Sequence, residues 1–137
     1  METRVMVVGS VKAENRLKKN KPRIRLTGPW LAEMGFQTDC LATAEYQFRQ
    51  ITIRLQGSGL EAYSKVVKKA LSSREGLLQV RQERLRDKRH PHLQLAGFWL
   101  EDLGFKIGSL LVIRYEYGLI NLQLLDLDEL KERGFFG

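Results

Sequence analysis

The feature that most constrains this chain is a stretch of sequence that occurs twice. Residues 22–55 (copy one) align without a gap on residues 91–124 (copy two), at a constant offset of 69 positions (91 − 22 = 69). Chance does not place glycines, aromatics and aliphatics in one register over this length, so the chain contains an internal duplication. The identical pairs are Pro22/Pro91, Leu26/Leu95, Gly28/Gly97, Trp30/Trp99, Leu31/Leu100, Gly35/Gly104, Phe36/Phe105, Leu41/Leu110, Tyr46/Tyr115, Ile51/Ile120 and Leu55/Leu124.

Each copy has the pattern of a strand, one short helix and a hairpin. Polar and apolar side chains alternate over residues 23–26 and 92–95, which is the period of a strand with one face in solvent. In copy one Pro29 suits the first turn of a helix, and Gly35 suits its left-handed end. The hairpin strands are predicted at 40–47 and 50–55, then at 109–116 and 119–125.

A unit of this size cannot bury a core of its own, because domains below roughly 40 residues are marginal. We therefore expect the two copies to pack together as one pseudo-twofold domain. Three segments are predicted within it. They are a first repeat with a leading strand and a basic loop (1–55), a hinge with an amphipathic helix (56–75), and a second repeat with an acidic tail (76–137).

The sequence RIRLTGPWLAEMGF, at residues 23–36 of copy one, closely resembles the SymE-like toxins of type I toxin–antitoxin modules. A strand, then Pro-Trp-Leu-x-x-x-Gly-Phe, then a hairpin is similar to the AbrB/MazE swapped-hairpin superfamily. The resemblance implies a mainly β fold with short helices (α+β). In it, two tandem β-α-β-β units form one pseudo-twofold swapped-hairpin β-barrel. The helical spacing of apolar residues over 60–73 predicts the connecting amphipathic helix.

The resemblance also carries expectations about partners. In the AbrB superfamily two chains interlace into one barrel and bind DNA, whereas both halves lie in one chain here. We therefore expect an intramolecular pseudo-dimer, with higher oligomers left open. A SymE-like protein is expected to be a nucleic-acid-associated toxin for which RNA cleavage has been proposed. No catalytic motif is carried over by the resemblance.

Positive charge lies outside the two copies. Of the net charge of +7, residues 1–21 contribute +4 and residues 56–90 contribute +5, while the copies are near neutral and the tail is acidic. Basic segments ahead of each copy are typical of a protein that binds phosphate backbones. An ordinary solvated surface that keeps the protein in solution is the alternative.

The basic candidates for phosphate contacts lie in the two leading segments and on the strands of copy one. Arg23 and Arg25 should share one strand face, from which arginines can hold phosphates in bidentate fashion. Copy two has His92, Gln94 and Gln123 at the positions of Arg23, Arg25 and Arg54, so copy one is the better contact face. The full set of predicted nucleic-acid-binding residues is Lys18, Lys19, Lys21, Arg23, Arg25, Arg54, Arg84, Arg86, Lys88 and Arg89.

The sequence contains no recognisable catalytic motif. Two histidines, one cysteine and scattered carboxylates make no metal-site pattern, and neither a metal nor a cofactor is predicted. His90 and His92 could act as acid and base on an RNA 2′-hydroxyl, or could be plain surface residues. Glu45, Tyr46 and Arg49 near the first hairpin are a further set that a metal-free ribonuclease could use.

The expected compartment is the cytoplasm. A single cysteine, Cys40, excludes an intramolecular disulfide, the N-terminus lacks a signal-peptide pattern, and no apolar run could span a membrane. We expect a soluble protein without a membrane partner.

Three functions are consistent with these observations. The first is a nucleic-acid-binding protein that contacts RNA or DNA mainly through backbone phosphates. The second is a metal-independent endoribonuclease toxin that cleaves RNA. The third is an antitoxin-like module that binds a partner protein through the helix at 60–73 or the tail.

Overall fold

The structure, a computed structural model, describes residues 2–13, 15, 18–57, 76–85 and 88–125, with backbone alone at 76, 77, 79, 82–85, 88 and 89. The helix predicted at 60–73 and the acidic tail lie outside these residues. The elements are β1 (Glu2–Val7), β2 (Gly9–Val11), β3 (Lys21–Thr27), α1 (Pro29–Glu33), β4 (Leu41–Gln47), β5 (Gln50–Gly57), β6 (Gly76–Gln79), β7 (Arg81–Leu85), β8 (Lys88–Ala96), α3 (Trp99–Asp102), β9 (Leu110–Glu116) and β10 (Leu119–Leu124).

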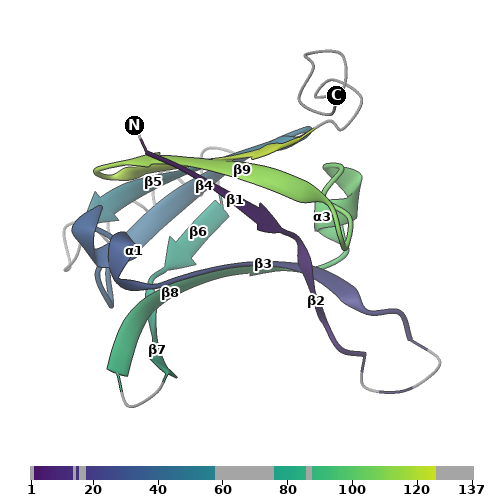
Figure 1. The fold of residues 1–137 in the computed structure, drawn as a ribbon, viewed down its shortest axis with the longest axis horizontal. Coiled ribbons are helices and arrows are strands. Elements are labelled where there is room, and N and C mark those ends of the chain that lie inside the picture. The colour runs from purple at the N-terminus through teal and green to yellow at the C-terminus, as the bar shows by residue number, and fades with distance from the viewer. Residues whose placement is uncertain (1, 14, 16–17, 58–75, 86–87, 126–137) are drawn as a thin grey trace, which may run out of the picture.

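The strands form two antiparallel sheets that face each other (Figure 1). One sheet, called here sheet A, has the order β1-β9-β10-β5-β4-β6, and sheet B has the order β2-β3-β8-β7. The mainly β fold with short helices is therefore confirmed. The closed barrel is wrong for the described strands, because their hydrogen bonds join them into two separate sheets.

Both copies contribute to both sheets. At the centre of sheet B, β3 of copy one pairs with β8 of copy two, and at the centre of sheet A, β5 pairs with β10. The outer strands of sheet A pair across the two repeats as well, since the leading strand β1 of the first repeat lies on β9 and the leading strand β6 of the second lies on β4. Every sheet therefore depends on hydrogen bonds between the two copies.

Each leading strand passes from one sheet to the other at a buried valine. The chain crosses from β1 to β2 at Val8, whose backbone N–H donates to the Ser109 carbonyl (2.9 Å). The second crossing, from β6 to β7, is at Val80, whose N–H donates to the Cys40 carbonyl (2.9 Å). The first strand ends ahead of Gly9, and β2 begins at that residue.

The described part of the second basic segment forms the ends of two strands rather than a loop like that of the first repeat. Arg84 and Leu85 end β7, and Lys88 and Arg89 begin β8, so that Arg84 pairs with Arg89 and Leu85 with Lys88. The first basic segment is a loop, as predicted, between β2 and β3. The basic residues ahead of copy one therefore lie mainly in a loop, whereas the described ones ahead of copy two lie at the ends of strands.

The short helices begin and end where the sequence predicts. Pro29 occupies the first turn of α1, and Gly35 follows its end with a φ of 91°. A side chain at Gly35 would be strained by that φ, and its Cβ would lie 2.9 Å from the Leu55 and Tyr117 side chains. Hairpin tips dock at these helix ends, since Gly118 donates to the Met34 carbonyl (2.8 Å).

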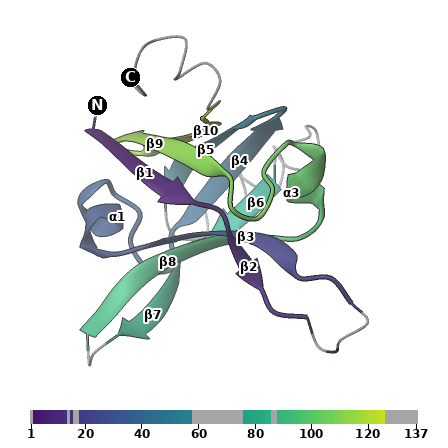
Figure 2. The same cartoon turned by 45° about the vertical axis from the view of Figure 1, so that its right-hand side comes forward.

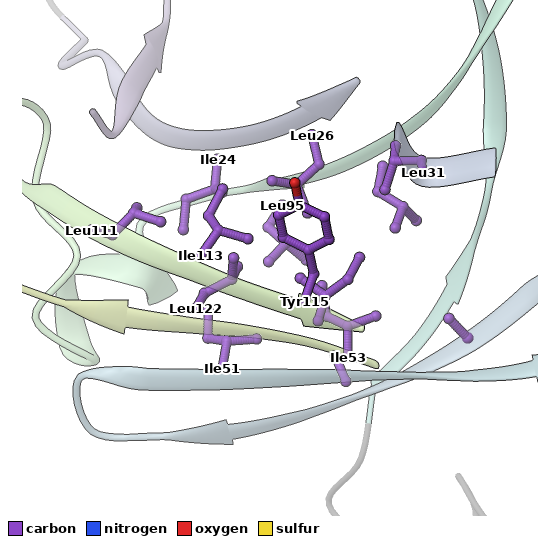
Figure 3. Close-up of a cluster of buried hydrophobic side chains, with 14 of the residues drawn as sticks. Ile24, Leu26, Leu31, Ile51, Ile53, Leu95, Leu111, Ile113, Tyr115 and Leu122 are labelled. Carbon is purple, nitrogen blue, oxygen red and sulfur yellow. The ribbon is translucent and has the colours of Figure 1, made fainter. Parts of the chain in front are cut away.

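The core lies between the two sheets, where the inward side chains of every central strand meet (Figure 3). Matching positions of the two copies are buried together, as in the pairs Ile24 and Leu93 or Ile53 and Leu122. Because strand side chains alternate between faces, the residues between these positions point outward from the sandwich. The inner faces thus carry the stability and leave the outer faces for other roles.

The tryptophan of each copy packs on the tyrosine that the other copy has at the repeated position 46 or 115. The rings of Trp30 and Tyr115 lie 4.7 Å apart, and those of Tyr46 and Trp99 lie 4.9 Å apart. The first pair is further covered by Arg4, whose guanidinium lies 5.0 Å from the Trp30 ring centroid. Trp30 is 7% exposed, whereas Trp99 is 37% exposed.

This difference in burial makes a test of the core. Trp30→Ala is expected to lower the free energy of unfolding by about 3–5 kcal/mol, as for buried aromatics. Trp99→Ala is expected to cost less, because part of that ring already lies in solvent. Urea unfolding of the two variants checks the order, and an equal or larger loss for Trp99→Ala would contradict it.

Candidate nucleic-acid interface

The outer face of sheet B carries a row of polar and basic side chains. Lys21, Arg23, Arg25 and Thr27 occupy alternate positions of β3 while Pro22, Ile24 and Leu26 point into the core. On the neighbouring β8, Ala96 lies opposite Arg23, Gln94 opposite Arg25 and His92 opposite Thr27. The next strand, β7, adds Arg81 opposite His92. The predicted sharing of one face by Arg23 and Arg25 is confirmed.

The pKa of His92 is sensitive to the positive charge of this face. Burial lowers the pKa of His92, and the positive charge of Arg25 lowers it further. A hydrogen bond with the Gln94 side chain acts in the opposite direction, and the charges of Arg23 and Arg81 add to the lowering. Three arginines therefore act on one imidazole, beside a hollow of about 350 Å³ lined by Arg81, His92, Gln94 and Ala96.

Lysines of the first basic loop extend the row at the other end of β3. Lys18, Lys19 and Lys21 line a hollow together with Lys12, and all four side chains are exposed. This hollow lies against Phe98, at the beginning of α3. The basic loop of copy one and a helix of copy two therefore meet there, on the same side of the molecule (Figure 2).

Other predicted contact residues are not brought to this face. Arg54 lies on β5 of sheet A and forms an exposed ion pair with Glu45 (3.1 Å). The backbones of Arg84, Lys88 and Arg89 lie in the β7–β8 hairpin, next to the row, and Arg86 lies outside the described residues. The structure thus groups Lys18, Lys19, Lys21, Arg23 and Arg25 and separates Arg54 from them.

Two residues of this region were missed by the sequence analysis. Arg81 was not among the predicted contact residues, because its pairing with His92 depends on the strand register. Phe98 stands at the position of Pro29 within an otherwise similar motif, and that replacement was the available signal.

The acid–base candidates fall in the same region. His90 and His92 are two positions apart on β8, so both point outward from sheet B. Tyr46 lies elsewhere, against Trp99, and burial raises its pKa. Cys40 is partly buried, and its Sγ donates to the Gly35 carbonyl at 3.8 Å. Within the described residues, no three His, Cys, Asp or Glu side chains gather as they would to hold a metal ion.

The fold and this face define a small two-sheet β protein with one strongly basic surface. Comparison with protein families adds a closer likeness: residues 73–123 match the family described as "Toxin SymE, type I toxin-antitoxin system". The matched residues include β6 to β9 and most of β10, so the predicted resemblance to SymE-like toxins is confirmed over residues 73–123. No curated protein and no solved structure matches significantly. No helix among the described residues is long and apolar enough to cross a membrane.

The charge of the face can be measured at His92. Its pKa is expected to lie below the ordinary value of 6.5, because burial and three arginines disfavour the imidazolium. Stability associated with His92 is accordingly present above pH 6.5 and is lost as the pH falls below it, since the unfolded chain takes up the proton first.

Proton NMR titration of the imidazole provides the test. Arg25→Gln should raise the pKa of His92 toward 6.5, while Arg54→Gln on the other sheet should leave it unchanged. A pKa at or above 6.5 in the unaltered protein would contradict this description of the face.

Proposed function

We propose that this SymE-like protein binds nucleic acid, RNA or DNA, mainly through backbone phosphates on the outer face of sheet B. The observation that carries the proposal is the alignment of Arg23 and Arg25 on β3 with Arg81 on β7, continued by the lysines of the first loop. Cations held on rigid strands lose little freedom when they engage phosphates, and they release condensed counterions.

The strand pairing supports the finer fold relationship that the sequence suggests. Exchange of β1 and β6 between the copies is the arrangement expected of a swapped-hairpin protein of AbrB/MazE type. We extend the SymE-like relationship to copy one on the strength of the 69-position repeat. An intramolecular pseudo-dimer follows, and a cytoplasmic location fits a nucleic-acid ligand.

RNA cleavage is the second candidate function, and one observation favours it: His90 and His92 share the basic face of sheet B. A neutral histidine could take the proton of a ribose 2′-hydroxyl, whose oxygen then attacks the adjacent phosphorus. The bond from phosphorus to the 5′-oxygen breaks, and a protonated histidine returns a proton to that oxygen. Nearby arginines would stabilise the charge on the phosphate in the transition state.

The test of cleavage uses labelled RNA and a histidine-free variant. If the second candidate is right, the protein breaks RNA without added metal, and His90→Ala with His92→Ala abolishes breakage while leaving binding largely intact. Intact RNA after prolonged incubation would remove this candidate and leave the binding proposal untouched. Strand breakage that survives in the double variant would remove these two histidines as catalytic residues.

Phosphate binding on sheet B is tested by replacing its two central arginines. Arg23→Gln with Arg25→Gln should weaken binding to RNA or DNA and flatten the dependence of log K on log salt by about two units. Glutamine keeps much of the apolar stem, so the fold should persist, which circular dichroism checks.

A matched control removes two arginines from sheet A. Arg54→Gln with Arg114→Gln changes the net charge by the same amount, and both side chains are exposed on the opposite sheet. This variant should bind almost as the unaltered protein does. An equal loss of nucleic-acid affinity in both variants would show that binding depends on net charge alone. Nucleic-acid binding that does not weaken with added salt would contradict phosphate contacts and favour a protein-interaction module.

A further inference from the structure

A hollow of about 330 Å³ combines lysines with an exposed aromatic ring. Its lining is Val11, Lys12, Ala13, Lys18, Lys19, Lys21 and Phe98. The Phe98 side chain is 43% exposed, although phenylalanine is among the residues that are most often fully buried. The Lys21 ammonium lies 6.0 Å from the centroid of that ring, so cation and aromatic face are already adjacent.

Both repeats line the hollow, and the segments that form it differ from their counterparts elsewhere in the chain. Where copy two has Phe98 before its helix, copy one has Pro29, which offers no aromatic face. The loops differ too, since nine residues separate β2 from β3 and two separate β7 from β8. The aromatic ring and the longer basic loop therefore occur together at one end of sheet B.

We propose that this hollow binds an unpaired base of single-stranded nucleic acid, stacked on Phe98, with flanking phosphates held by the lysines. This inference rests on the proposed function and adds the class of ligand. Every base has a π face, so stacking on one ring is tolerant of sequence. Bases within a duplex are stacked on one another and reach such a ring only after unstacking, so a single strand is favoured.

The neighbouring strand offers a path for the rest of the ligand. Lys21, Arg23 and Arg25 occupy successive outward positions of β3, spaced by roughly 6.7 Å along the strand. Phosphates of an extended single strand have a comparable separation, so the backbone can follow β3 from the hollow toward His92. Phe98 lies at the beginning of this path, since it comes two residues after Ala96, the strand partner of Arg23.

The experiment compares Phe98→Ala with the unaltered protein on single-stranded RNA and on duplex DNA of equal length. Loss of one stacked base should weaken single-strand binding about fivefold or more. Duplex binding and the salt dependence of both should change little, because no charge is removed. Phe48→Ala is the matched control, since that ring is 71% exposed and lines a different hollow, away from the lysines of the first basic loop.

The outcomes separate this inference from the proposed function. If the unaltered protein binds in a salt-dependent way and Phe98→Ala binds single strands equally well, the stacking site is overturned and phosphate binding stands. Failure of the unaltered protein to bind either nucleic acid would overturn both. Should Phe98→Ala unfold, Phe98→Leu keeps the bulk without the π face and is expected to show the same selective loss.

Discussion

The structure depends on hydrogen bonding between the two copies of the repeat. The central pairs β3–β8 and β5–β10 each join one copy to the other, and the edge strands β1 and β6 are exchanged in the same way. Neither copy could complete its sheets or cover the inner face of its strands alone. Crossing of the leading strands at Val8 and Val80 ties the two sheets together around one core.

The candidate function follows from what that core leaves unused. Stability requires apolar residues only at the inward positions, so the outward positions of β3 can carry lysine and arginine at little structural cost. The halves share the apolar character of their inner positions and differ outside, where Arg23 and Arg25 stand opposite uncharged residues of β8. A symmetric scaffold thus presents an asymmetric basic face, with an aromatic ring at one end.

Local patterns predicted much of the fold. The alternation around Ile24, the proline at position 29 and the glycine at position 35 each produced the expected element, because each acts through its immediate neighbours. Strand partners are long-range and could not be read in this way. Arg54 was therefore grouped with Arg23 although it lies on the other sheet, and Arg81 was missed beside His92.

The most direct test of nucleic-acid binding on sheet B is an NMR map of backbone amide shifts as short single-stranded RNA is added. Binding on sheet B should change the shifts along β3 and β8 and at the described loop residues next to Lys21, with the strands of sheet A little affected. Changes concentrated on β4, β5, β9 and β10, or no change at concentrations where other nucleic-acid-binding domains saturate, would contradict it.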